Sequence, residues 1–193
     1  MNASSRSGHS NAFFSGFGPA KRVVLYDTLT DSLDVAAIKS VLAHELAHWR
    51  EGHIWKFVAL SIIRLGAVVA ALAALLEFGV AYDAVAAPET PYVGLFVGLL
   101  FILPVNRLTS PVENYFSLAY ERDADAYAVE IVGGEPMARA LASLAADNLS
   151  VPFAHPWYET FHYDHPPIPE RMRRVRELDA DRETPAGAGQ ATD

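Results

Sequence analysis

The sequence contains no cysteine, and this absence limits what the protein can be. Neither a disulfide framework nor a cysteine-ligated zinc site is possible, so any bound metal must be held by His, Asp or Glu. Positive charge is also scarce: the net charge of −8 argues against a nucleic-acid partner. The first residues, MNASSRSGHSNAFF, lack the apolar segment of a signal peptide. The 193 residues, 51% of them hydrophobic, are enough for one domain with a sizeable core.

Two apolar runs are present and predict a membrane protein. The twenty residues 57–76 carry one charge, Arg64, and about twenty apolar residues cross a bilayer core. A buried helix of a soluble protein is the alternative, and the arginine gives it some support. A shorter run follows at 92–105, and Pro104 would kink its end. Together the runs predict a transmembrane helical hairpin at about 57–105, with the lipid bilayer as a partner.

The charges that flank this hairpin predict its orientation. The connecting loop carries Asp83 and Glu89 but no Lys or Arg, whereas the outer flanks carry Arg50, Lys56 and Arg107. Because positively charged flanks stay on the cytoplasmic side, both flanks are expected there. We therefore expect an integral membrane protein whose site faces the cytoplasm.

The residues before the hairpin predict a small β-hairpin and one helix. Residues 12–27 favour two short strands around a Gly/Pro turn. A polar segment, TLTDSLD, then leads into a helix over Val35–Arg50, which Asp31 or Asp34 can cap and Gly52 can end.

The residues after the hairpin are expected to be mainly helical. Helices are predicted over three segments: 110–134, 135–150 and 169–178. Between the last two lies a loop rich in proline and aromatic residues, 151–170. The tail 179–193, rich in Ala, Gly and acidic residues, is expected to be disordered. The fold class is therefore mainly α with a small β-hairpin.

The segment VLAHELAHWREGH, residues 41–53, places polar chemistry inside a predicted apolar helix. Positions i and i+4 lie about 40° apart on a helix, so His44 and His48 can present two imidazoles to one ion. Glu45 lies about 100° round from His44, where it can take a proton from an attacking water. This is the H-E-x-x-H arrangement of zinc peptidases, with glutamate as the general base. Incidental histidines are the alternative, but unpaired polar groups among Val, Leu and Ala would be costly.

A catalytic zinc site needs a third protein ligand. His53 is a poor candidate, because it lies five residues past His48, about 140° round an uninterrupted helix. The extended metzincin pattern also fails, since the positions of its glycine and histidine hold Glu51 and Ile54.

Better candidates for the third ligand lie in YERDADAYA. Glu121 and Asp125 are an i, i+4 pair on one helical face. Glu121 can complete a His₂Glu site, and Asp125 can accept a hydrogen bond from a ligand histidine. Glu113 and Asp123 remain rivals, because the spacing does not exclude them.

The downstream segment HYDHPPIPERMRR adds His162, His165 and Arg171. Close to an active site, such a histidine can donate a hydrogen bond to an oxyanion, and the arginine can pair with a substrate carboxylate. The alternatives are a structural histidine and a basic surface helix.

Four successive blocks resemble the type I CAAX prenyl proteases: HSNAFFSGFGPAKRVVLYDTL, VLAHELAHWREGH, AYERDADAYA and DNLSVPFAHPWYETFHYDHPPIPERM. The resemblance covers nearly the whole chain up to about Leu178 and keeps the order of the family's blocks. Heat-shock-type membrane metalloproteases share the zinc motif and the Glu/Asp pair, but they resemble the HSNAFF and HPPIPER blocks less well.

The resemblance implies a zincin-like membrane metallopeptidase with one Zn²⁺ per chain. Its implied site residues are the ligands His44, His48 and Glu121, the catalytic Glu45 and His165, the supporting Asp125, and the substrate-binding Asn11 and Arg171. Family members remove the C-terminal tripeptide from isoprenylated CAAX proteins, and some cut other membrane peptides. A peptide or protein substrate is therefore the expected partner.

The chain departs from the family in having two candidate spans where the family has seven. We expect one catalytic domain over 1–178, without the family's N-terminal transmembrane part. A short linker before the zinc helix and an Ala- and Arg-rich composition favour a bacterial inner membrane; a eukaryotic chain would lie in the endoplasmic reticulum membrane. Two other functions stay open: a heat-shock-type quality-control protease with broad substrates, and an inactive membrane scaffold.

Overall fold

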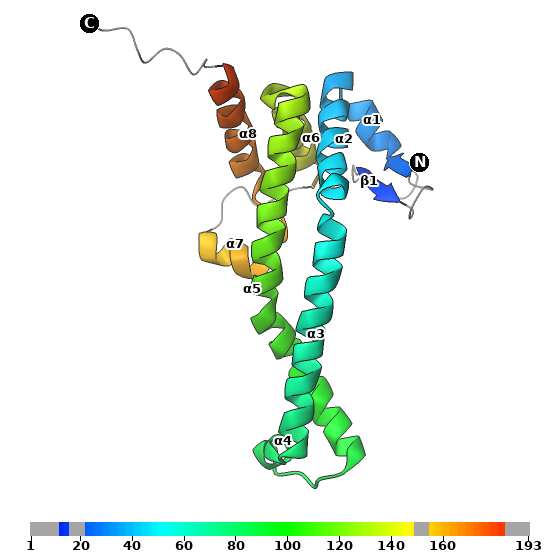
Figure 1. Cartoon of the computed structure of the whole chain (residues 1–193), viewed down its shortest axis with the longest axis vertical. Helices are drawn as coiled ribbons and strands as arrows, with labels where there is room; N and C mark the ends of the chain where they lie inside the picture. The colour runs from blue at the N-terminus through cyan, green and yellow to red at the C-terminus, as the bar shows by residue number, and fades with distance from the viewer. Residues whose placement is uncertain (1–11, 16–21, 149–154, 184–193) are drawn as a thin grey trace, which may run out of the picture.

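The computed structural model describes residues 12–15, 22–148 and 155–183, and most of them are helical. Figure 1 shows short helices gathered at one end of an elongated molecule, from which two long helices extend as a hairpin. The mainly α-helical fold class and the helical hairpin expected from the sequence are therefore confirmed.

The predicted β-hairpin is also present. Strand β1 (Ala12–Ser15) pairs antiparallel with β2 (Arg22–Leu25), so that Ala12 lies opposite Leu25. The turn between the strands lies outside the described residues, and so does Asn11. The assignment of Asn11 to the substrate cleft therefore stays a prediction.

Helix α2 (Val35–Arg50) has the bounds that the sequence predicts. Asp34 is its N-cap, and Asp34 Oδ1 accepts a hydrogen bond of 2.7 Å from the Ala37 N–H. The polar segment before it is not irregular, because it forms a short helix, α1 (Asp27–Ser32). The reason is burial of Leu29, a tertiary contact that a single apolar residue does not reveal in the sequence.

A glycine joins α2 to the first long helix. Gly52 has φ +67°, in the left-handed region that glycine enters without steric cost, and α3 (His53–Glu77) begins at the next residue. A second left-handed glycine, Gly79, precedes the short helix α4 (Val80–Ala84) in the turn of the hairpin. The helix with the H-E-x-x-H motif and the long apolar helix are thus connected by two residues, Glu51 and Gly52.

Helix α5 (Pro91–Val132) is a single element of 42 residues, bent by 42° just before Pro104. The kink at Pro104 is confirmed, whereas the division into an apolar run at 92–105 and a helix from 110 is wrong. A proline removes one backbone hydrogen bond and bends a helix, but contacts along both arms can keep the helix continuous.

The two sides of the hairpin approach each other closely at two glycines of α5. A side chain at Gly98 would meet Leu72 of α3 at 3.1 Å, and one at Gly94 would collide with the Tyr82 hydroxyl. The spacing Gly94–x₃–Gly98 is typical of closely packed helices in membranes.

Arg64, the one charge in the long apolar run, is paired across the hairpin. Its Nε lies 2.9 Å from Glu113 Oε1, and its Nη1 donates to Asn106 Oδ1 at 3.2 Å and to Thr109 Oγ1 at 3.0 Å. These contacts neutralise and hydrogen-bond the guanidinium between the two helices, as an ionisable group at membrane depth requires. Glu113, a rival candidate for the third metal ligand, is thus paired with Arg64.

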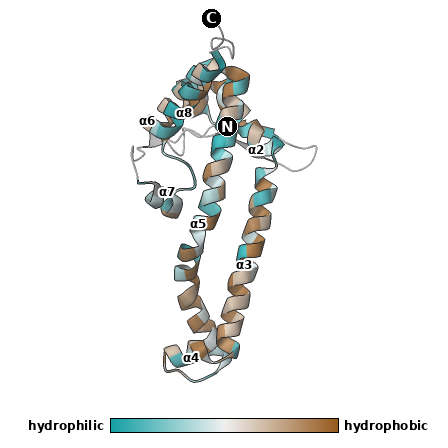
Figure 2. Ribbon diagram, turned by 60° about the vertical axis from the view of Figure 1, so that its left-hand side comes forward, coloured by the Kyte–Doolittle hydropathy of each residue, from teal (hydrophilic) through white to brown (hydrophobic). Residues whose placement is uncertain are grey.

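Much of the hairpin consists of hydrophobic residues (Figure 2). Helix α3 is long and apolar enough to cross a membrane, and its most apolar stretch is not buried inside the molecule. The parts of α5 before and after its bend are together also long and apolar enough to form one bent span. The exposed side chains of α3 include Ile62, Ile63, Leu65 and Val69. Such a surface is costly in water and is matched by the hydrocarbon of a bilayer.

Three helices complete the described chain: α6 (Gly134–Asn148), α7 (Pro156–His162) and α8 (Ile168–Glu183). Helix α6 lies where the sequence predicts one. Helix α7 lies in the segment predicted as a loop, where Pro156 occupies the favourable first position of a helix. The prediction that the tail is disordered from Asp179 onward is wrong for residues 179–183, because α8 continues to Glu183. Residues 184–193 lie outside the described part.

The core lies where α2, α5, α6 and α8 meet. Ala43, Ala128, Leu141 and Val175, one from each helix, are almost completely buried. Leu178 packs against the same cluster, which explains why α8 continues through a highly charged sequence. The core thus fixes α2 against α5, and these are the two helices that carry the candidate site.

Candidate metal centre

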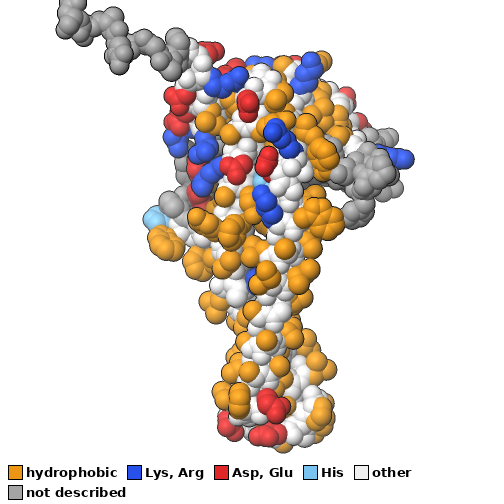
Figure 3. Space-filling view, viewed as in Figure 1, with side chains coloured by type: hydrophobic (Ala, Val, Ile, Leu, Met, Phe, Trp, Pro, Cys, Tyr) orange, Lys and Arg blue, Asp and Glu red, His pale blue; other side chains and the backbone are white. Residues whose placement is uncertain are grey.

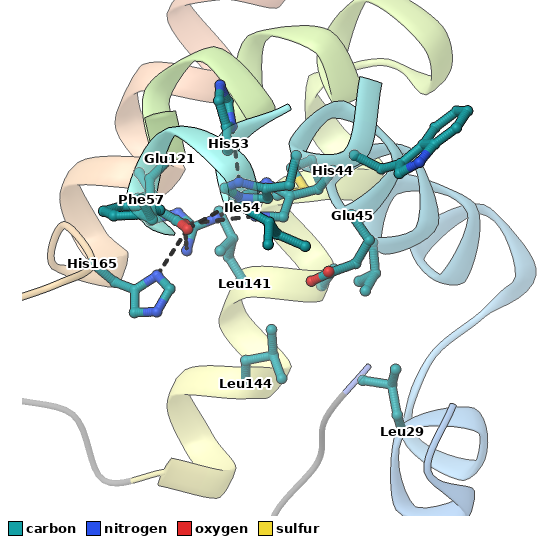
Figure 4. A pocket seen from close by; sticks show the side chains of 16 residues that line it. Leu29, His44, Glu45, His53, Ile54, Phe57, Glu121, Leu141, Leu144 and His165 are labelled. Carbon is teal, nitrogen blue, oxygen red and sulfur yellow. Dashed lines mark hydrogen bonds and ion pairs between the residues drawn. The ribbon is translucent and has the colours of Figure 1, made fainter. Parts of the chain in front are cut away.

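Three side chains from α2 and α5 converge: those of His44, His48 and Glu121. Figure 4 labels His44 and Glu121 among the residues that line the neighbouring pocket. The Nε2 atoms of His44 and His48 are 3.2 Å apart. Glu121 Oε2 lies 3.5 Å from His44 Nε2, and Glu121 Oε1 lies 3.2 Å from His48 Nε2. These residues can hold a metal ion. The other rival ligand, Asp123, is exposed and is not part of this group.

The spacing of the donor atoms fits zinc. Ligand atoms at about 2.0–2.1 Å from a tetrahedral Zn²⁺ lie roughly 3.3 Å from one another. The two histidine nitrogens are 3.2 Å apart, and each lies 3.2–3.5 Å from one of the two Glu121 oxygens. With one atom taken from each residue, the three donors lie within 4.8 Å of one another. Glu121 Oε2 is buried and makes no hydrogen bond within the described residues, although it contacts charged and ionisable neighbours. A buried carboxylate oxygen in that position is well suited to a cation.

Asp125 contacts Nδ1 of the His44 ring, the nitrogen that does not face His48 and Glu121. Its Oδ1 lies 2.9 Å from His44 Nδ1. An ionised carboxylate only accepts, so His44 carries its proton on Nδ1 and presents a lone pair at Nε2. Burial raises the pKa of Asp125, but hydrogen bonds from His44 and Arg171 outweigh it and hold the pKa below its usual value.

Arg171 of α8 connects the two buried acids. Its Nε and Nη2 donate to Asp125 at 2.8 and 2.6 Å, and its Nη1 lies 3.2 Å from Glu121 Oε2. The guanidinium therefore offsets negative charge directly behind the candidate ligands. Pairing of Arg171 with a substrate carboxylate stays a prediction, and all three of its nitrogens already contact acids.

His165 approaches the group from the solvent side. Its Nδ1 lies 3.0 Å from Glu121 Oε1, while 60% of its side chain is exposed. The hydrogen bond with Glu121 raises the pKa of His165. His162 is not brought into the site, because its ring stacks on Tyr158 at 4.1 Å and lies beside Arg107.

Glu45 faces a cavity of about 380 Å³ next to the histidines (Figure 4). The apolar part of the cavity wall includes Leu29, Val41, Met137, Leu141 and Leu144. The Glu45 carboxylate makes no hydrogen bond to the rest of the described chain, and burial raises its pKa. A carboxylate with a raised pKa binds a proton more readily. A general base needs this property if it is to take a proton from water and later pass it to the leaving group.

His53 is a neighbour of the site that the sequence did not identify. The ring is buried, and its Nδ1 lies 3.0 Å from His48 Nδ1. The projection that placed His53 about 140° away assumed a continuous helix. Gly52 ends that helix and redirects the chain, so the glycine was the available signal.

Known proteins resemble this chain over most of its length. The model of peptidase family M48 matches residues 1–179. The CAAX prenyl protease 1 homologue of Oryza sativa subsp. japonica is 34% identical in an alignment 195 positions long, which covers 95% of this chain and 44% of the relative. The homologue of Arabidopsis thaliana is 35% identical in an alignment 188 positions long, which covers 91% of this chain and 42% of that relative.

The fold is also similar to a solved structure. The crystal structure of S. mikatae Ste24p matches with a TM-score of 0.74 and 28% identity, over 90% of this chain and 43% of that chain. The chain therefore spans less than half the length of the relatives it matches. Because the family model covers nearly all of it, the chain belongs to peptidase family M48.

Proposed function

We propose that this chain is the catalytic part of a membrane zinc endopeptidase that binds one Zn²⁺ through His44, His48 and Glu121. The observation that carries the proposal is the convergence of the two histidine Nε2 atoms and the Glu121 carboxylate beside Glu45. Two neutral imidazoles and one carboxylate form a known ligand set of catalytic zinc. When bound, the ion supplies Lewis acidity, which acidifies water and polarises a peptide carbonyl.

The protein side chains perform the proton transfers. Glu45 accepts a proton from water as the water oxygen bonds to the carbonyl carbon of the substrate. When the C–N bond breaks, Glu45 returns that proton to the leaving amine. His165, exposed beside Glu121, donates a hydrogen bond to the oxygen that becomes negative during the attack.

The substrate proposed is a membrane-associated peptide, with the C-terminal tripeptide of isoprenylated CAAX proteins as the leading case. Two observations support it: the apolar wall of the cavity, and the similarity to proteins named CAAX prenyl proteases. The hairpin then spans the bilayer, and the site lies on its cytoplasmic side.

The test compares Glu45→Gln with Glu51→Gln, an exposed glutamate of the same segment. Purified full-length chains are assayed for bound zinc and for cleavage of a farnesylated CAAX peptide. The Glu45 variant should bind zinc like the wild type and cleave at least about a hundredfold more slowly, while the Glu51 variant should stay active. Wild-type turnover by Glu45→Gln would refute the proposed base. Degradation of casein with no cleavage of the prenylated peptide would instead favour a quality-control protease.

A further inference from the structure

His53 is placed against a proposed metal ligand by a break in the helix. Gly52 adopts a left-handed conformation, and His53 therefore begins α3 with its ring directed back toward α2. The Nδ1 atoms of His53 and His48 are 3.0 Å apart, a hydrogen-bond distance drawn as a dashed line in Figure 4. Only 2% of His53 is exposed, so the ring is shielded from bulk solvent.

The roles of the two rings in this hydrogen bond follow from the proposed metal site. If His48 binds the ion through Nε2, that nitrogen has no proton, and the proton of the neutral ring must be on Nδ1. His48 Nδ1–H is then the donor, and His53 Nδ1 is the acceptor. His53 consequently carries its own proton on Nε2.

A second helix holds the His53 ring in place. The ring stacks on Tyr120 with centroids 4.2 Å apart and an angle of 14° between the planes. Phe57 packs edge-on against the same tyrosine at 5.2 Å, and Lys56 Nζ lies 5.3 Å from its centroid. Tyr120 directly precedes Glu121, so the residue that fixes His53 is adjacent to the proposed carboxylate ligand.

We propose that His53 is a positioning residue for the metal centre: it accepts the Nδ1 proton of His48 and fixes that ring, as Asp125 does for His44. This rests on the proposed metal site. The two ligand histidines are thus held in different ways, one by an ionised acid and one by a neutral imidazole. The neutral partner orients His48 without adding another negative charge to those of Glu121, Asp125 and Glu45.

Two substitutions separate the hydrogen bond from the packing. His53→Phe keeps an aromatic ring to stack on Tyr120 and loses the acceptor. His53→Asn loses the stack and keeps an acceptor oxygen near the position of Nδ1. Tyr120→Phe keeps the stack and is the matched control. For each full-length variant, zinc affinity is measured by competition with a chelator, and the visible spectrum of bound Co²⁺ reports the ligand geometry.

The expected result is a loss of zinc affinity of about 10–100-fold in His53→Phe, with a changed Co²⁺ spectrum. His53→Asn should remain within a few-fold of the wild type, as should Tyr120→Phe. The proposal is overturned if His53→Phe binds zinc like the wild type, or if His53→Asn loses as much affinity as His53→Phe. A wild-type chain that binds no zinc would overturn the metal site itself, which is a different outcome.

Discussion

At the scale of single residues, the buried carboxylates of the candidate centre outnumber its buried guanidinium among the described residues. Glu121 and Asp125 are 4% and 1% exposed, and both are paired with the single guanidinium of Arg171. With Glu45 alongside, these buried and half-buried groups carry more negative than positive charge. A buried excess of negative charge is unfavourable, and a divalent ion between Glu121 and the histidines removes it.

Glu121→Gln should therefore weaken zinc binding by more than about a hundredfold, because the amide retains the shape but loses the charge that binds the metal. Asp123→Asn is the matched control, since Asp123 lies two residues away on α5, was a rival ligand, and is exposed. Dialysis against a zinc buffer followed by metal analysis measures both. Equal zinc in wild type and Glu121→Gln would show that the third ligand is another residue.

At the scale of elements, the connection between α2 and α3 depends on one backbone conformation. Gly52 and Gly66 both have open space where a side chain would begin, with no atom within 4 Å. They differ in their backbone, because Gly52 has φ +67° and Gly66 lies within α3. Comparing alanine substitutions at these two positions therefore separates the cost of backbone strain from the cost of steric overlap.

Gly52→Ala should destabilise the protein by about 1 kcal/mol, the cost of a left-handed conformation for an L-residue. For a chain of this size that corresponds to a decrease in Tm of roughly 2–4 °C. Gly66→Ala should leave the Tm unchanged or raise it, because alanine favours a helix. Thermal unfolding of both variants in detergent provides the comparison. A Gly52 variant as stable as Gly66→Ala would mean that the left-handed turn is not required.

Local signals explain which elements the sequence could predict. Helix α2 was predicted with its observed bounds because Asp34 caps its start and Gly52 closes its end within the chain itself. Continuity of α5 through Pro104 and Pro111 could not be predicted, since proline normally argues for a break and the contacts that maintain the helix come from other elements.

The same distinction applies to the site. The pairing of His44 with His48 follows from helical periodicity, and the i, i+4 pattern favours Glu121 as the third ligand without excluding Glu113 or Asp123. Gly52 signals that His53 leaves the regular helix, but it does not specify the contact of His53 with His48. That contact, like those of Arg171, depends on how a separate helix packs against α2 or α5. Spacing along the chain carries no information about that packing.

At the scale of the whole molecule, the candidate centre lies at one end of an apolar rod. Helix α3 has 25 residues, and at 1.5 Å per residue it is about 37 Å long, more than the roughly 30 Å of a bilayer core. Figure 3 shows acidic side chains at the tip of the hairpin, where Asp83 and Glu89 lie, and the blue Lys and Arg side chains toward the opposite end. This distribution suits a hairpin whose tip lies across the membrane from the site.

The absence of cysteine allows a direct test of this topology, because one introduced thiol is the only thiol in the chain. Ala84 near the tip and Ala142 of α6 are both exposed, and each is replaced by cysteine in a separate variant. In sealed right-side-out vesicles from an expressing bacterium, an impermeant maleimide should label Ala84→Cys at once and Ala142→Cys only after detergent is added. The unsubstituted chain should not react under either condition. Labelling of both positions from the same side would contradict the membrane-spanning hairpin, and the reverse pattern would contradict its orientation.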